Sequence, residues 1–132
     1  MPENMATVAG FLTALLLCNC LSSAAHEHEL LEHEVESYLE RGGQLEQRAH
    51  KLAAAAAGTA DELAAAEAAV PVRAEAEAAY RAAMLLDPFD ARAFFNLGHA
   101  LRAGGPSRTS ETIALFETAL ALEPLNLAGR NR

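Results

Sequence analysis

Cysteine is almost absent from this sequence, and that limits the kinds of small protein that it can encode. The two cysteines, Cys18 and Cys20, lie together in an apolar run near the start of the chain. Small disulfide-stapled folds need cysteines spread along the chain, and a four-thiolate zinc site needs twice as many as are present. Neither scaffold can be assembled from these cysteines.

Positive charge is also scarce. The formal net charge is -8, no Lys or Arg precedes Arg41, and the ten basic residues form no cluster. Nucleic-acid affinity depends on clustered Lys and Arg that neutralise phosphates. We therefore expect no nucleic-acid partner.

Signatures of catalysis are missing too. The Ser and Cys residues lack the partners that would activate a nucleophile, and no Gly-rich loop follows a strand. Gly104-Gly105 is better explained as a turn between helices. The sequence predicts a protein that is not an enzyme and uses no cofactor.

One segment, residues 26–34, carries the residue types that bind metals. A zinc-protease motif places two histidines four positions apart, whereas His28 and His33 are five apart and diverge by about 140° on a helix. The inverted motif fails because Glu29 stands where histidine is required. Glu29 and His33 leave a weak surface ion open, but a solvated helix face is the preferred interpretation, and no metal site is predicted.

Alanine is the residue that the chain has in excess. Residues 53–57 and 64–66 are all alanine, and alanine has the highest helix propensity because it loses no side-chain entropy. No segment has the pattern of a strand. The predicted fold class is all-α.

The apolar run from Met5 to Leu21 resembles a secretory signal peptide, because small residues follow it and offer a cleavage site near Ala24 or Ala25. Its acidic start, with Glu3 in place of a basic residue, departs from that pattern. Retention as a membrane anchor and burial as the first helix of the fold are the alternatives. We expect residues 1–25 to be a signal peptide or anchor, and the protein to be secretory or extracellular, or else membrane-anchored.

Apolar periodicity and stop signals divide the remainder into helices. Arg41-Gly42-Gly43 predicts a break, Gly58 a left-handed cap, Thr59 and Glu62 a capping box, and Pro71 an interruption. The predicted helices are 26–40 and 44–57 as an N-terminal hairpin, then about 59–69, 72–86, 91–103 and 109–122.

An internal repeat links two of these segments. Residues 80–90 align with residues 116–126 at a constant offset of 36, so that aromatic, Ala, Leu, acidic and Pro positions recur. Together with Phe94, Leu97-Gly98 and Leu101, the residues Phe116, Ala119 and Pro124 resemble the tetratricopeptide repeat, whose period is about 34 residues.

The resemblance implies a short solenoid of stacked antiparallel helical hairpins. It places two repeats at 57–126, with the 26–57 hairpin before them and a short tail at 127–132. The earlier repeat departs from the family at Ala60 and Glu67, and the later one at Thr112. Small Gly98 and Ala119 are expected where the two helices of one hairpin approach closely.

Proteins of this family bind other proteins, and the first helix of each repeat lines their concave surface. The predicted partner-binding face therefore uses the helices at 59–69 and 91–103. On the second helix it comprises Arg92, Phe95, Asn96, His99 and Arg102. Forked arginine donors and an amide suit an acidic or carboxylate-bearing peptide; an ordinary solvated helix face is the alternative.

The last helix carries two apolar stripes, Ile113-Phe116-Leu120 and Leu115-Ala119-Leu122, only one of which can face its own hairpin. The other predicts contact with a partner, including a second copy. The expected function is a protein-binding scaffold, and the alternative is the N-terminal repeat segment of a larger enzyme, used for substrate docking. A membrane partner is expected only if residues 5–21 are retained.

Overall fold

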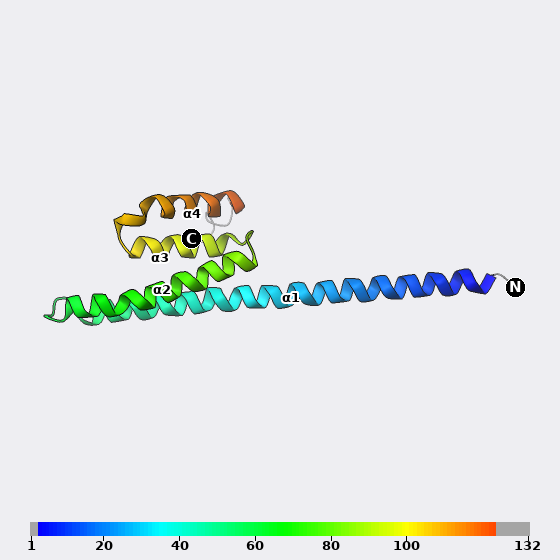
Figure 1. Ribbon diagram of the computed structural model, residues 1–132, viewed down its shortest axis with the longest axis horizontal. Helices are drawn as coiled ribbons and strands as arrows, with labels where there is room; N and C mark the ends of the chain where they lie inside the picture. The colour runs from blue at the N-terminus through cyan, green and yellow to red at the C-terminus, as the bar shows by residue number, and fades with distance from the viewer. Residues whose placement is uncertain (1–2, 124–132) are drawn as a thin grey trace, which may run out of the picture. The chain divides into compact units, whose positions relative to one another are not determined.

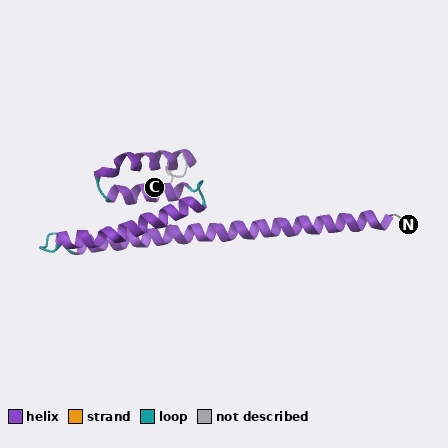
Figure 2. Cartoon of the chain, viewed as in Figure 1, coloured by secondary structure: helices purple, strands orange, loops and turns teal. Residues whose placement is uncertain are grey.

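The computed structural model describes residues 3–123, with the side chains of residue 10 and residues 12–123. Every regular element in that range is helical, as Figures 1 and 2 show, and the all-α prediction is confirmed. The elements are α1 (Glu3–Ala55), α2 (Glu62–Leu86), α3 (Ala91–Ala103), a 3-10 helix η1 (Pro106–Arg108) and α4 (Thr109–Leu122). The chain divides into two units, Met1–His33 and Glu34–Arg132.

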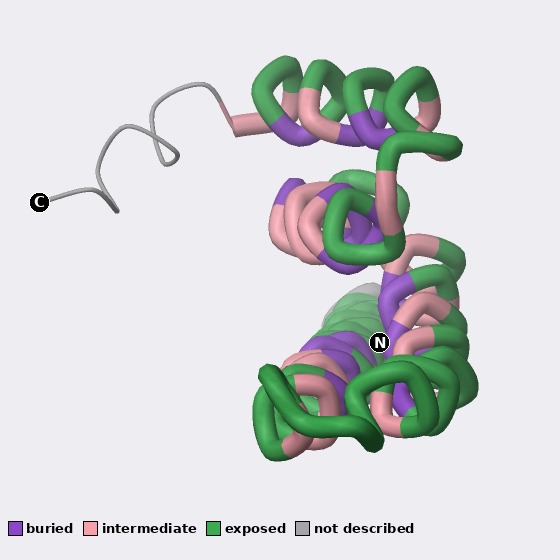
Figure 3. Tube along the Cα trace, turned by 90° about the vertical axis from the view of Figure 1, so that its left-hand side faces the viewer, coloured by how far each residue is buried: buried purple, intermediate pink, exposed green. Residues whose placement is uncertain are grey.

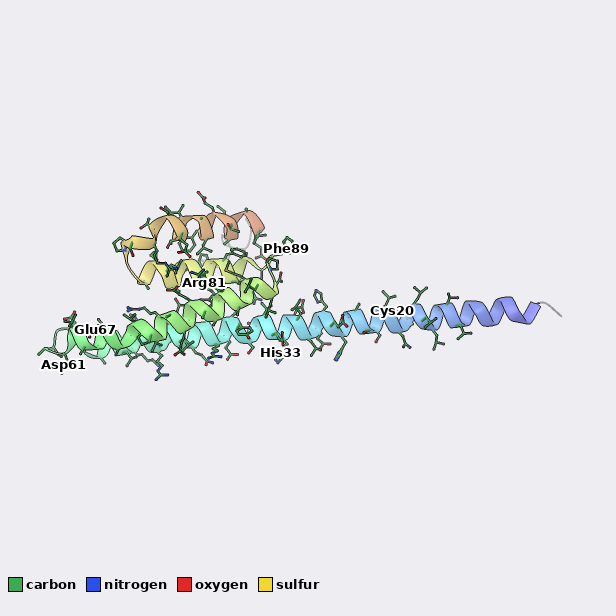
Figure 4. The ribbon with its side chains drawn as sticks, viewed as in Figure 1. Cys20, His33, Asp61, Glu67, Arg81 and Phe89 are labelled. Atoms are coloured by element: carbon green, nitrogen blue, oxygen red, sulfur yellow. The ribbon has the colours of Figure 1, made fainter. Side chains whose placement is uncertain are left out.

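The described part of the first unit is helical, and the apolar side chains described there are exposed. Leu15, Leu16, Leu17 and Leu21 are all more than half exposed, and the free thiol of Cys20, labelled in Figure 4, is exposed as well. A search of the described residues finds no helix with the length and hydropathy needed to cross a membrane.

The break expected at Arg41-Gly42-Gly43 does not occur. Helix α1 continues through these residues to Ala55, so residues 26–57 are not a helical hairpin. Gly42 is buried, and a Cβ added there would overlap the ring of Tyr80. The missing side chain is used for close packing rather than for a stop, and that packing compensates for the roughly 1 kcal/mol by which glycine disfavours a helix.

The next turn is where the sequence indicated it. Gly58 has φ of 78°, the left-handed conformation expected of a glycine after a helix. Its N–H donates to the carboxylate of Glu62 over 3.2 Å, and Thr59 Oγ1 accepts from the N–H of Asp61 over 3.3 Å. Helix α2 begins at Glu62, three residues after the expected start at Thr59.

The interruption expected at Pro71 does not occur either. Helix α2 runs continuously from Glu62 to Leu86 with Pro71 inside it, so residues 57–90 do not form a hairpin of their own. Pro71 is exposed, so the Glu67 carbonyl that loses its helical partner remains open to water. The alanines around it favour the helix strongly enough to continue through the proline.

Helices α3 and α4 have the bounds that the sequence predicted. Asp90 caps α3 by accepting the N–H of Arg92 over 2.9 Å. Gly105, with φ of 110°, supplies the turn before η1 and α4. The predicted end signal Pro124 and the tail at 127–132 lie outside the described residues.

Within the second unit the helices stack in chain order. The chain reverses after Ala55, so α2 returns along the 34–55 part of α1, and α3 then lies between α2 and α4 (Figures 1 and 3). One core joins the layers, and its largest fully buried side chains are Tyr80, Leu97 and Leu101. Its remaining members are Val35 and Leu39 from α1, Ala76 and Ala83 from α2, Ala93 and Ala100 from α3, and Leu115 from α4.

The two stripes of the last helix are distinguished by burial. Leu115 and Ala119 are buried against α3, whereas Ile113 and Leu120 are each about half exposed. Helix α4 therefore packs through the second stripe. Of the first stripe, Ile113 and Leu120 face away from the core, whereas Phe116 packs against α3.

The same glycine–aromatic contact recurs in both hairpins. Gly42 of α1 faces the ring of Tyr80 on α2, and a Cβ at Gly98 of α3 would come within 2.7 Å of Cε1 of Phe116 on α4. Real Cβ atoms do not approach a ring so closely. Within each helix pair, the two helices can therefore pack this near to each other only because these positions lack a side chain. Tyr80 and Phe116 are also the aromatic positions of the repeat in the sequence.

Candidate functional site

Helix α3 is the middle layer of the second unit, and the five predicted site residues lie on different sides of it. Arg92 is near its N-terminus, Phe95 and His99 face α4, and Asn96 and Arg102 lie with His99 along the side toward α1 and α2. They do not form a single face.

Arg92 is engaged in structural ion pairs. Its guanidinium meets the carboxylate of Asp90 at 2.7 Å and reaches Glu36 on α1 at 2.7 Å. The hydrogen bonds that Arg92 donates to Asp90, with a further contribution from the bond to Glu36, raise the pKa of Arg92 despite its partial desolvation. The residue therefore connects α3 to α1 and is a poor candidate for holding a ligand.

Phe95 takes part in an aromatic cluster between α3 and α4. Its ring centroid lies 4.6 Å from that of His99, edge-on, and 5.6 Å from that of Phe116. His99 and Phe116 are 5.4 Å apart, again edge-on. These are favourable aromatic geometries, and they fix the orientation of the His99 ring.

A groove of about 500 Å3 lies on the side of α3 that faces α1 and α2. This volume falls within the range of about 300–1,000 Å3 that is usual for ligand sites. Of the predicted residues, Asn96, His99 and Arg102 line it. Its other lining residues are Glu46, Gln47, Ala49 and His50 from α1, Arg73 and Ala76 from α2, and Ala100 and Ala103 from α3.

The groove is hollow because its floor is made of small side chains. Ala49, Ala76 and Ala100 come from three different helices, and all three are buried. A methyl group from each helix leaves a space that longer side chains would fill. Polar side chains from the same helices stand around this apolar floor, with Gln47 and His50 on an exposed rim.

The walls of the groove carry excess positive charge. Arg73 and Arg102 line it, and neither forms an ion pair with a carboxylate within the described part of the chain. Arg102 Nη2 lies 3.5 Å from His99 Nδ1. The one acidic lining residue, Glu46, accepts a hydrogen bond from the hydroxyl of Tyr80 over 2.7 Å.

Burial and the bond to Glu46 raise the pKa of Tyr80 well above its ordinary value. The hydroxyl is therefore held in its protonated, donating form. Glu46 is the single carboxylate among the lining residues, so the groove sets two arginines against one negative charge.

His50, Arg73, Gln47 and Glu46 were not predicted as site residues. They belong to helices for which the sequence suggested breaks, so their alignment beside α3 could not be foreseen. The sequence does carry a signal for this alignment. In α1, Tyr38 is followed by Gly42 four positions later and by Leu45 three positions after that. The same spacing occurs in α3 as Phe94, Gly98 and Leu101. This pattern marks residues 38–45 as the equivalent of the first helix of the second hairpin.

An ion-pair network fixes the other side of the stack. Arg108 of η1 meets Glu77 of α2 at 2.7 Å and Glu111 of α4 at 2.9 Å, and Arg81, labelled in Figure 4, meets Glu111 at 2.9 Å. Hydrogen bonds from Arg81 and then Arg108 lower the pKa of Glu111, and the bond to Glu77 is the main reason that the pKa of Arg108 is raised. The network links α2 to α4, and the charged side chains that form it on that surface are paired with one another.

The histidine-rich segment brings no metal ligands together. His28 Nδ1 lies 3.3 Å from a carboxylate oxygen of Glu32 on the next helical turn, and both side chains are exposed. Among the side chains that the structure describes, no three His, Cys, Asp or Glu are placed to hold one ion.

No family model, curated protein or solved structure matches the chain.

Proposed function

We propose that the chain is a helical-repeat interaction module, of the tetratricopeptide kind, that binds an acidic segment of a protein partner in the groove between α1, α2 and α3. The observation that supports this most directly is the polarity of the groove. Two arginines without carboxylate partners, two histidines and two amides surround it in a chain whose formal net charge is -8. Carboxylates are the groups that such donors recognise.

The repeat itself supports the proposal in a second way. Two hairpins, each closed by a glycine that faces an aromatic ring, lie side by side, so the first helix of each one borders the same groove. Stacked hairpins commonly bind ligands on this surface. The residues proposed for recognition are Arg73, Asn96, His99 and Arg102, with His50 and Gln47 on the rim.

Fluorescence anisotropy with a labelled hexaglutamate peptide tests the proposal, with hexaglutamine as the neutral comparison. The double variant Arg73→Gln/Arg102→Gln should weaken hexaglutamate binding by about ten- to a hundredfold, since hydrogen bonds to charged groups contribute about 1.5–3 kcal/mol. The control Arg48→Gln/Lys51→Gln removes the same two charges from exposed positions on α1 that do not line the groove. It should change the affinity by less than about twofold.

A steric variant separates the groove from general electrostatics. Ala103 is exposed at the end of α3 and lines the groove, so Ala103→Trp should block it without changing any charge. Ala114→Trp on the exposed face of α4 is the matched control. Equal affinity of both tryptophan variants and the parent would refute this site.

The residues first expected to bind give a further control. Arg92→Gln should leave hexaglutamate binding unchanged, because that side chain is held by Asp90 and Glu36 outside the groove. Loss of binding without loss of stability in this variant would restore the original interpretation of α3 as a single binding face.

We propose separately that residues 1–25 direct the chain into the secretory pathway. Exposed leucines in this stretch, among them Leu16 and Leu21, contribute to no core cluster of the described residues, as suits a segment read by a targeting machinery. N-terminal sequencing of the cell-expressed protein tests this: a mature end near His26 supports cleavage. A retained run that resists carbonate extraction indicates a membrane anchor instead.

A further inference from the structure

Charge is distributed very unevenly along this chain. All ten Lys and Arg residues come after residue 40, whereas seven of the eighteen acidic residues lie within the first 40 residues. Five of these seven are the glutamates at 27, 29, 32, 34 and 36, and all five are exposed. We call residues 26–36 the acidic segment.

The acidic segment has the chemistry that the groove would recognise. It presents glutamates at short intervals with no Lys or Arg among them, and the groove presents Arg73 and Arg102 without carboxylate partners. Complementary charge of this kind favours encounter and fixes register between partners.

The end of this segment cannot enter the groove of its own molecule. Glu34 and Glu46 belong to the same continuous helix, α1, and at 1.5 Å per residue they are about 18 Å apart along its axis. Glu36 is already paired with Arg92 at 2.7 Å. Glu34 and Glu36, the part of the segment that belongs to the same unit as the groove, therefore do not supply carboxylates to it.

We propose that the groove of one copy binds the acidic segment of a second copy of this chain. The inference rests on the proposed function, since it names the partner of that same groove. Groove and segment are different surfaces of one chain, so two copies can bind each other reciprocally in a two-fold dimer, or each copy can bind the next in a ring or an open chain.

Sedimentation velocity of the full-length chain in dilute and concentrated salt provides the first measurement. Association through carboxylate–arginine contacts is screened by salt, so the association constant should fall by about tenfold or more between about 0.05 and 0.5 M NaCl. Association through the exposed leucines of α1 or α4 would be unchanged or strengthened. The latter result would overturn the proposal.

A charge swap provides the decisive measurement. The groove variant is Arg73→Glu/Arg102→Glu, and the segment variant is Glu27→Lys/Glu29→Lys/Glu32→Lys/Glu34→Lys. Each variant alone places like charges in the contact and should sediment as a monomer. An equimolar mixture pairs the acidic groove with the basic segment, as well as the parent groove with the parent segment, and association should return.

Circular dichroism of each variant checks that the helices are intact. A control with Arg48→Glu and Lys51→Glu reverses two charges on the exposed side of α1 without touching the groove, and it should associate as the parent does. Failure of the mixture to associate while both variants are folded would overturn the proposal. So would a parent chain that is monomeric at about 100 μM in dilute salt.

A synthetic peptide of residues 26–37 distinguishes this inference from the proposed function. If the peptide binds the parent groove and the full-length chain remains monomeric, the groove recognises acidic segments but not another copy. If neither hexaglutamate nor the peptide binds, both proposals fail together. Binding of hexaglutamate without the peptide leaves the proposed function intact and excludes the second copy as partner.

Discussion

Two neighbouring glycines in α1 should respond in opposite directions to the same substitution. Gly42 and Gly43 are both inside the helix, and alanine in place of glycine would favour a helix by about 1 kcal/mol at either position. Their surroundings differ. A Cβ at Gly42 would lie 2.7 Å from Cζ and 2.8 Å from Cδ1 of Tyr80, whereas a Cβ at Gly43 would meet nothing nearer than the Tyr80 hydroxyl at 3.9 Å.

The cost at Gly42 follows from how firmly Tyr80 is held. Carbon atoms pack at about 3.5–4.0 Å, so the ring must move by roughly 1 Å to admit the methyl group. Tyr80 is 1% exposed and its hydroxyl is bonded to Glu46 over 2.7 Å. Overpacking of this kind costs about 1–3 kcal/mol, and a strained bond to a carboxylate about 1.5 kcal/mol more.

After the propensity gain is subtracted, Gly42→Ala should lower the free energy of unfolding by about 1.5–3.5 kcal/mol. Gly43→Ala should raise it by about 0.5–1 kcal/mol. Urea titration followed by circular dichroism at 222 nm measures both values under one set of conditions. Equal effects at the two positions, or stabilisation by Gly42→Ala, would refute the packing role assigned to Gly42.

A double variant identifies the origin of the cost. With Tyr80→Ala as background the ring is gone, so adding Gly42→Ala should no longer destabilise and should instead give the propensity gain. At Gly98 the same substitution meets Phe116, which is only half-buried and has no hydroxyl to hold it. Gly98→Ala should therefore cost less than Gly42→Ala.

Three further variants test other contacts. The raised pKa of Tyr80 implies stability that is complete below about pH 10 and is lost as the pH rises further; Tyr80→Phe should remove this alkaline dependence and cost about 1–2 kcal/mol at pH 7, measured by urea titration at several pH values. The lowered pKa of Glu111 implies stability that is present above about pH 4.5 and is lost as the pH falls; Glu111→Gln should flatten the acid limb of the same profile, whereas an unchanged limb would exclude the ion pairs with Arg81 and Arg108. Pro71→Ala should raise the unfolding free energy by about 1–3 kcal/mol in an urea titration, because the exposed proline interrupts the hydrogen bonds of α2; no gain would mean that the helix is already broken there.

The helices whose bounds the sequence predicted to within one residue are those with a start signal and a stop signal in the local sequence. Helix α3 begins after an aspartate that caps it and ends before Gly104-Gly105. Its one internal glycine, Gly98, was not predicted to end the helix. The bounds of α1 and α2 were wrong for one shared reason. The local preferences of Gly42 and Pro71 predicted that a helix would end at each of them. Packing against Tyr80 keeps α1 continuous through Gly42, and the alanines around Pro71 keep α2 continuous.

The sequence predicted only the part of the candidate site that lies on a single helix, α3. Asn96, His99 and Arg102 share a helix face, and periodicity alone groups them. His50 and Arg73 join them only because α2 pairs with the 34–55 part of α1 and places both beside α3. That pairing joins residues far apart in sequence, and a break assumed at Gly42 removes it. The tetratricopeptide assignment itself stays a prediction.

Unequal hairpins explain why a groove exists where it does. The second helices of the two hairpins repeat at an offset of 36, as Tyr80 and Phe116, but the first helices repeat at an offset of 56, as Gly42 and Gly98. The difference between these offsets means that α1 and α2 extend further from the Gly42–Tyr80 contact toward their connecting turn than α3 and α4 extend from the Gly98–Phe116 contact. Helix α3 ends at Ala103. The groove is lined from α1 by residues 46–50, which follow the Gly42–Tyr80 contact, and from α3 by residues up to Ala103. Extension of one repeat, rather than a change in its packing contact, is therefore what brings His50 and Arg73 beside α3.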